Sequence, residues 1–305
     1  MSQLHRVLVA VDFSERGRGA FDYALALSRL HGAELLAVHA VPTDRRFNWH
    51  ARKRIALIGS LRHAAEAAGV RFKVSVQHGD PAGVILLHAT ARRADLIVLG
   101  ASERSGFDRF RFGSVAETVA LAATQPVLVV PPTSGTPADS MTPFKNILVA
   151  VDLGGGSSEK VERALSMGNG SDRVTVLHVV PGMPFERSFR YPHHLMEPEY
   201  QRLLARDAWR RIATVVPTGT TASRKIHARV VTGDPSKEIS RVAADIDADL
   251  ILIGVTPRGA LGRMIFGSTA ARVIRSARRP VLAIPQLAEP AMVPVSDEDQ
   301  FAVAA

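Results

Sequence analysis

The sequence predicts two tandem open α/β domains, each with a parallel five-stranded sheet covered by helices on both faces. Three observations predict this fold class. Short apolar runs typical of strands alternate with helical stretches, which implies βαβ crossovers and a parallel sheet. The same order of motifs then occurs a second time, which indicates an internal duplication. A length of 305 residues also fits two domains of ordinary size.

Matching segments show the duplication. RVLVAVDFS at 6–14 matches NILVAVDLG at 146–154, and AVHAVP at 37–42 matches VLHVVP at 176–181. Four later pairs keep a constant offset of 154: HGDPAGVI and TGDPSKEI, ADLIVLGAS and ADLILIGVT, RFGSVAETV and IFGSTAARV, QPVLVVP and RPVLAIP. The earlier pairs have smaller offsets, so the second copy holds an insertion of about 15 residues, for which the segment 181–200 is the candidate.

The repeats set the expected domain boundaries. The first domain is expected at 1–131 and the second at 144–286. The residues between them, 132–143, are rich in Pro, Ser and Thr and have the composition of a linker. The segment 287–305 has no sustained periodicity and is expected to be a flexible tail.

The elements of the first copy follow in order along the chain. Val7 to Val11 is a short β-branched run typical of a buried strand, and residues 18–30 place apolar side chains at helical spacing. The strand ELLAVHAV, a helix around 50–68 and the alternating strand VRFKVSVQ come next. Asp80 is placed to cap a helix that begins at Pro81, where the missing N–H has no cost. DLIVLG, GSVAETVALAA and PVLVVP predict the last strand, helix and strand.

Composition narrows the function classes. The chain has no cysteine, which removes disulfides, thiol catalysis and thiolate metal sites and fits a reducing compartment, so we expect a cytoplasmic location. The first apolar run is too short for a signal peptide, and no apolar stretch of about 18 residues predicts a membrane helix. The net charge of +9 suits nucleotides, nucleic acid or anionic lipid and does not choose among them.

Both copies carry a glycine loop where a ligand would bind. Ligands of open parallel sheets bind beyond the carboxyl ends of the strands, at the switch point of strand order. The loop begins at Gly100 and ends at Gly113-Ser114 in the first copy, and runs from Gly254 to Gly267-Ser268 in the second. Each Gly-Ser pair begins a predicted helix, whose free N–H groups and dipole favour an anion.

These motifs resemble the universal stress protein family. The resemblance rests on VAVDFS, VHAVP, VLGAS, the Gly-Ser pair and PVLVVP, and it covers nearly the whole chain twice, so the chain looks like a tandem member. It implies a fold related to the adenine-nucleotide alpha hydrolases and, in the ATP-binding branch, a loop of the form Gly-x2-Gly-x9-Gly-Ser/Thr. It also implies that the last strands pair the domains as an internal pseudo-dimer, and we expect that two chains can associate further.

The resemblance implies nucleotide contacts at matched positions. The residue at the end of strand one would lie near the nucleoside, a strand-two residue would meet adenine through its backbone, and the loop and helix start would hold phosphate and ribose. These residues are Asp12, Ala40, Gly100, Gly113, Ser114 and Val115 in the first copy, and Asp152, Val179, Gly254, Gly267, Ser268 and Thr269 in the second.

The middle glycine of the loop is absent from both copies. Glu103 stands there in the first copy and Pro257 in the second. A carboxylate aimed at a triphosphate would repel it, although turned outward it could pair with a neighbouring arginine. Proline donates no N–H and fixes its own φ. Both clefts stay candidates, with a slight preference for the second because it lacks the acidic group.

Simpler structural roles also account for some of these residues. Asp12 could cap the helix that follows it, and packing is a better reading than metal binding for His39 and His178 at the ends of buried strands. The pair His193-His194 is not accompanied by HExxH or a Cys/His cluster, so no metal site is predicted. P-loop, GxGxxG and GxSxG motifs are absent as well, so we expect no efficient catalysis and at most weak ATPase activity.

The leading hypothesis is a stress-response regulator that binds an adenine nucleotide, ATP with Mg²⁺, in one or both domains and changes protein partners of unknown identity. The alternative is a scaffold that has lost nucleotide binding and holds a protein or an apolar ligand, with the aromatic residues Phe185, Phe189 and Tyr191 of the insertion available for contact. Nucleic-acid binding ranks last, because neither interleaved aromatic residues nor a recognised motif accompanies the positive charge.

Overall fold

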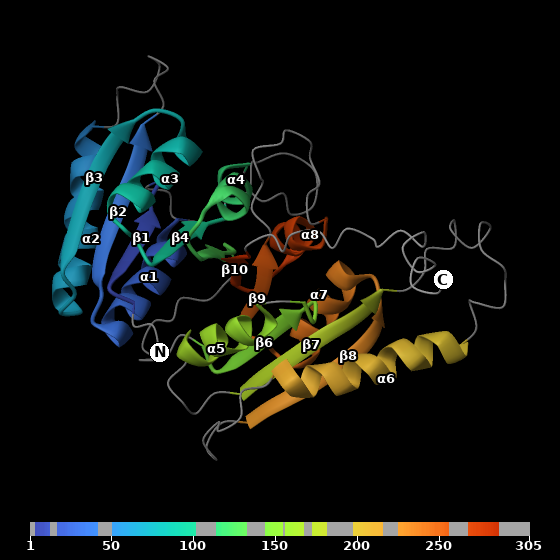
Figure 1. Cartoon of the computed structure of the whole chain (residues 1–305). Helices are drawn as coiled ribbons and strands as arrows, with labels where there is room; N and C mark the ends of the chain where they lie inside the picture. The colour runs from blue at the N-terminus through green and yellow to red at the C-terminus, as the bar shows by residue number, and fades with distance from the viewer. Residues whose placement is uncertain are drawn as a thin grey trace, which may run out of the picture.

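The strands of both copies form one continuous sheet of ten strands (Figure 1), in the order β3-β2-β1-β4-β5-β10-β9-β6-β7-β8. The computed structural model describes residues 4–12, 17–41, 51–101, 114–132, 144–154, 156–167, 173–181, 198–215, 225–255 and 268–286. All neighbouring strands are parallel except β5 and β10, which pair antiparallel with Leu128 opposite Leu282. The predicted α/β class is therefore confirmed, and the two parallel halves are continuous with each other.

The first copy contains five strands and four helices among the described residues. They are β1 (Arg6–Ala10), α1 (Arg18–His31), β2 (Glu34–Val41), α2 (Ala51–Ala67), β3 (Phe72–His78), α3 (Pro81–Ala91), β4 (Leu96–Gly100), α4 (Ser114–Ala122) and β5 (Val127–Val130).

The second copy repeats this order in the part of the chain that is described. Its elements are β6 (Asn146–Val151), α5 (Ser157–Met167), β7 (Arg173–Pro181), α6 (Pro198–Val215), β8 (Lys225–Gly233), α7 (Pro235–Asp245), β9 (Leu250–Val255), α8 (Ser268–Ser276) and β10 (Val281–Pro285).

Alternation along the central strands builds two hydrophobic layers, one on each face of the sheet. Val7 and Val9 of β1 pack in one layer with side chains of α1, α2, α5 and α6. Leu8 between them packs in the other layer with α3, α4, α7 and α8. Successive side chains of a strand point to opposite faces, so the apolar runs of the sequence are strands covered on both sides.

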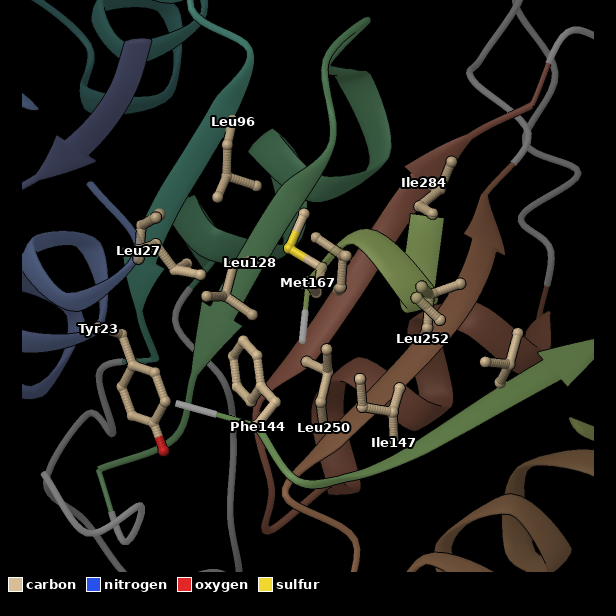
Figure 2. Close-up of a cluster of buried hydrophobic side chains, with 14 of the residues drawn as sticks. Tyr23, Leu27, Leu96, Leu128, Phe144, Ile147, Met167, Leu250, Leu252 and Ile284 are labelled. Carbon is tan, nitrogen blue, oxygen red and sulfur yellow. The ribbon is translucent and has the colours of Figure 1, made fainter. Parts of the chain in front are cut away.

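Each layer is continuous across the junction of the two copies. Figure 2 shows Tyr23 of α1 beside Phe144, which precedes β6, with Leu128 and Met167 close by. The two aromatic rings are stacked, with centroids 5.7 Å apart and an interplanar angle of 18°. Phe144 and Leu128 are 0% and 1% exposed, so the two copies share one core.

The helix caps follow the sequence. The carboxylate of Asp80 accepts a hydrogen bond from the backbone N–H of Gly83 at 2.9 Å, and Pro81 is the first residue of α3. Asp234 caps α7 in the same way and accepts from the backbone N–H groups of Ser236 and Lys237. Because these caps follow β3 and β8 directly, they fix where the chain turns at the carboxyl edge of each half of the sheet.

Candidate functional site

A cavity of about 460 Å³ opens at the carboxyl ends of the strands of the second copy. β6 lies between β7 and β9 in the sheet. The chain runs from β6 through α5 to β7 on one side, and later crosses from β8 through α7 to β9 on the other side. This arrangement is the switch point of strand order, where ligands of open α/β sheets bind. The helices α7 and α8 form further walls, through Ile239 and Ala270.

Four of the six residues predicted in the second copy line this cavity. They are Asp152, which follows β6, Val179 of β7, Gly254 of β9 and Thr269 in the first turn of α8. Ser268 is the first residue of α8, and Gly267 lies outside the described residues. Sequence positions more than 100 residues apart thus meet around one space.

The matched residues of the first copy lie at the same edge of the sheet. Asp12 follows β1, Ala40 lies in β2 and Gly100 ends β4, and these three strands are neighbours. Ser114 and Val115 begin α4. Gly113 and the altered loop position Glu103 lie outside the described residues, as does Pro257 in the second copy.

Asp152 is held by three donors on a single oxygen. Its Oδ1 accepts from Nζ of Lys160 at 3.0 Å, from Oγ of Ser157 at 3.2 Å and from the backbone N–H of Gly154 at 3.3 Å. Burial acts to raise the pKa of the Asp152 carboxyl, but the charge and hydrogen bond of Lys160 outweigh it and hold that pKa below its usual value. The carboxylate is therefore ionised and fixed in orientation.

The turn after Asp152 is held from the neighbouring helix. Leu153 has a φ of 61°, a left-handed conformation that is uncommon for any residue other than glycine. Its carbonyl accepts a hydrogen bond from Nη2 of Arg211 in α6 at 2.7 Å. This contact supports the conformation that places Asp152 at the mouth of the cavity.

Lys160 is a cavity residue that the motifs of the sequence did not predict. Its side chain is 2% exposed and lies on the buried face of α5, beside Val161 and one turn before Ala164. The matched position in the first copy is Ala20, also on a buried helix face. The signal in the sequence was a lysine at a helix position that holds a buried alanine in the other copy. Because lysine is almost never fully buried unless it is paired, a lysine at such a position indicates a nearby acidic partner.

Gln286 is a second cavity residue that the motifs did not predict. A Cβ atom on Gly254 would lie 2.5 Å from Oε1 of Gln286, so only glycine lets this amide lie against the end of β9. The backbone N–H of Gln286 donates to the carbonyl of Val255 at 2.7 Å and holds the residue beside the cavity. Pro132 stands at the matched position of the first copy.

The two strand-end histidines link neighbouring strands. Nδ1 of His39 lies 2.7 Å from the carbonyl oxygen of Val11, and Nδ1 of His178 lies 2.9 Å from that of Val151. A carbonyl can only accept, so Nδ1 carries the proton in both rings. This bond favours the packing role for these histidines. Within the described ranges, no group of three or more His, Cys, Asp or Glu side chains could hold a metal ion.

The walls of the cavity are tied to each other and to the first copy. Oδ1 of Asp234 accepts from Oγ of Ser236 and from two backbone N–H groups, and Oδ2 pairs with Nη1 of Arg272 in α8 at 3.0 Å. The serine hydroxyl, the helix N–H groups and Arg272 together lower the pKa of Asp234 to about 2. Leu121 of α4 also lines the cavity, so the first copy contributes to this site.

The charged contact across the junction lies beside this shared wall. Nη1 of Arg275 in α8 lies 2.9 Å from Oε1 of Glu117 in α4.

None of the helices in the described ranges is long and apolar enough to span a membrane.

Comparison with known proteins gives the family. The sequence model of the universal stress protein family matches residues 3–131 and again 143–285. Universal stress protein MJ0531 of Methanocaldococcus jannaschii is 31% identical over 147 residues, 46% of this chain and 82% of that protein. Universal stress protein YxiE of Bacillus subtilis is 30% identical over 145 residues, 41% of this chain and 98% of that protein.

A solved structure shows the same fold over nearly the whole chain. It is a universal stress protein from Archaeoglobus fulgidus, with a TM-score of 0.66 and 20% sequence identity, and the match covers 93% of this chain and 99% of the other. The double family match and this similarity in fold agree with the duplication seen in the sequence. The chain belongs to the universal stress protein family, as a member with two tandem domains.

Proposed function

We propose that this protein binds an adenine nucleotide, ATP, in the cavity of its second domain and acts as a regulator that responds to that nucleotide. The observation that carries the proposal is the meeting of Asp152, Val179, Gly254 and Thr269 around one cavity at the switch point of the sheet. A volume of about 460 Å³ falls within the range of small-molecule pockets, about 300–1,000 Å³.

Each part of a nucleotide has a suitable partner in this cavity. As the family resemblance implies, the backbone of Val179 in β7 would meet the edge of adenine. The apolar side chains of Ile253 and Leu121, which line the cavity, suit the faces of its ring. The first turn of α8, with Thr269, offers N–H groups and a positive dipole end to phosphate. Mg²⁺ would enter with the triphosphate, whose oxygens are among its preferred ligands.

The first domain is a second candidate for the same ligand. Asp12, Ala40, Gly100 and the start of α4 occupy matched places at the ends of neighbouring strands. A cytoplasmic location and the domain boundaries 1–131, 132–143, 144–286 and 287–305 are part of this proposal.

An apolar ligand is the alternative that one observation favours. Several cavity residues are aliphatic, among them Leu121, Leu177, Ile239 and Ile253. A protein that holds such a ligand with these side chains alone needs no phosphate at α8. It would bind the apolar ligand and would show no binding of ATP at any concentration of Mg²⁺.

The test is to identify what the purified protein carries and what it takes up. The protein is purified gently and denatured, released nucleotides are identified by chromatography, and the stripped protein is titrated with ATP and Mg²⁺ by calorimetry. Near-stoichiometric ATP or AMP, with a saturable titration, supports the proposal. Absence of released nucleotide together with no binding at millimolar ATP would refute it.

A matched pair of variants locates the site. Ala270 lines the cavity, and Ala116 holds the same position in the first domain; they are 8% and 3% exposed. Ala270→Leu narrows the cavity and is expected to lower ATP affinity in the second domain, whereas Ala116→Leu leaves that domain's affinity unchanged. Thermal unfolding of both variants checks that the larger side chain has not unfolded the protein, since overpacking costs about 1–3 kcal/mol.

A further inference from the structure

The cavity of the second domain is lined by a buried lysine, Lys160. Its side chain is only 2% exposed. An ammonium group has three N–H donors. Within the described part of the chain, Nζ of Lys160 donates to Oδ1 of Asp152 and to no other acceptor. A buried polar group with spare donors facing a cavity is suited to hydrogen-bond an oxygen or nitrogen of a ligand.

The carboxylate beside it offers the complementary acceptor. Lys160, Ser157 and Gly154 all donate to Oδ1 of Asp152. None of these three donors contacts Oδ2, and the Asp152 side chain, 61% exposed, lines the cavity. The cavity therefore presents an N–H donor and a carboxylate acceptor next to each other, held together by a hydrogen bond of 3.0 Å.

The place of this pair in the sheet indicates which part of a nucleotide it meets. β6, which ends at Val151 before Asp152, lies between β7 and β9. Under the proposed function the base lies at β7 and the phosphates lie at the start of α8, which follows β9. The sugar joins base and phosphate, so it lies above the end of β6. The 2′- and 3′-hydroxyls of ribose are neighbouring groups that can each donate and accept a hydrogen bond.

We propose that Lys160 and Asp152 together bind the vicinal diol of ribose in the second cleft. Lys160 donates to one hydroxyl oxygen, and Oδ2 of Asp152 accepts from the other hydroxyl. This inference rests on the proposed function and adds selectivity for ribonucleotides over deoxynucleotides. The first domain has Ala20 at the position of Lys160, so it has no ammonium group there to make the same contact.

The experiment compares ATP with 2′,3′-dideoxy-ATP, which lacks both hydroxyls, in calorimetric titrations with Mg²⁺. The wild-type protein is expected to bind ATP about tenfold or more tightly than the dideoxy compound, because hydrogen bonds to charged groups are strong. Lys160→Met keeps the length of the side chain and removes the donor. It is expected to weaken ATP binding about tenfold and to narrow the difference between the two nucleotides.

Two further variants distinguish two possible roles of Lys160, namely donation of a hydrogen bond to ribose and electrostatic attraction of the phosphates. Lys237→Met removes an exposed lysine from the same domain and is expected to change neither affinity. Lys160→Gln keeps a donor without the charge and is expected to retain part of the preference for ATP. If Lys160 acted only through its charge on the phosphates, Lys160→Met would weaken ATP and the dideoxy compound equally, and the inference would be wrong.

The outcomes distinguish failure of the diol contact from failure of nucleotide binding itself. A wild-type protein that binds both nucleotides equally well overturns the diol contact and leaves nucleotide binding in place. A wild-type protein that binds neither overturns the proposed function and the diol contact with it. The wild-type comparison needs no substitution, so it holds even if a variant fails to fold, which thermal unfolding would reveal.

Discussion

Nζ of Lys160 lies 3.0 Å from Oδ1 of Asp152, and the exposed fractions of the two side chains are 2% and 61%. The lysine therefore depends on the aspartate far more than the aspartate depends on the lysine. Water can solvate Asp152 without its partner, whereas the ammonium of Lys160 would be left buried without a countercharge. Because the two side chains differ in burial, substituting one or the other is expected to change stability by different amounts.

Removing the aspartate should destabilise the fold more than removing the lysine. We expect Asp152→Ala to lower the free energy of unfolding by about 1–3 kcal/mol, less than for a fully buried pair because this carboxylate is largely solvated. Lys160→Met should cost less, since its apolar chain remains buried. Urea denaturation measures both, with Asp12→Ala as the matched control in the first domain. Equal losses for Asp152→Ala and Lys160→Met would contradict the account.

The cap of α7 should give a pH-dependent contribution to stability. Hydrogen bonds and Arg272 lower the folded pKa of Asp234 to about 2, from an unperturbed 3.8. The folded state binds the proton less well, so the contribution is present above about pH 4 and is lost as the pH falls to about 2. Asp234→Ala should cost about 1–2 kcal/mol at pH 7.

The matched cap gives the control for Asp234. Asp80 caps α3 through one backbone N–H, from Gly83, so Asp80→Ala should cost less than Asp234→Ala at pH 7. Denaturant unfolding of wild type and both variants between pH 2 and pH 7 provides the measurement. A penalty for Asp234→Ala that stays constant down to pH 2 would show that the ionised carboxylate does not stabilise the helix.

The shared core should make the two domains unfold together. Tyr23 and Phe144 stack across the junction, and Phe144 is fully buried. Phe144→Ala should cost about 3–5 kcal/mol, and a double-mutant cycle with Tyr23→Ala should give a coupling of about 1 kcal/mol. Calorimetry of the wild-type chain should show a single transition. Two separate transitions would mean that each domain unfolds independently of the other.

The contact between Gly254 and Gln286 should control access to the cavity. A methyl group at Gly254 would collide with the end of the Gln286 side chain. Because that end can move, we expect Gly254→Ala to change stability by less than about 1 kcal/mol and to weaken ATP binding as the amide is pushed into the cavity. Adding Gln286→Ala should restore the affinity in calorimetric titrations. A double variant as weak as Gly254→Ala alone would show that Gln286 is not the obstacle.

Much of the fold could be predicted because it follows from local pattern. The run of β-branched residues from Val7, the capping Asp80 before Pro81 and the repeat itself are all visible in the chain, and α2 spans Ala51–Ala67 where a helix was expected around 50–68. The residue pattern of a strand at the edge of a sheet does not identify the strand that pairs with it. The pairing of β5 with β10 came from the family resemblance, and it joins the two expected sheets into one.

The candidate site was only partly predictable, for a physical reason. Asp152, Val179, Gly254 and Thr269 follow from motif positions at strand and helix ends. Lys160 does not, because a lysine on a helix is ordinarily solvated, and its burial depends on how α5 packs under the end of β6. Gln286 likewise reaches the cavity only through the pairing of β10 with β9. The influence of Glu103 and Pro257 on phosphate binding stays a prediction.

The proposed nucleotide in the cleft of the second domain can be sought in a crystal structure of the protein grown with ATP and Mg²⁺. Density for the nucleotide is expected between Val179 and the first turn of α8, with ribose at Asp152 and Lys160. A cleft that holds no nucleotide at saturating ATP would contradict the claim, and ATP bound in the first domain alone would move the function to the other half of the chain.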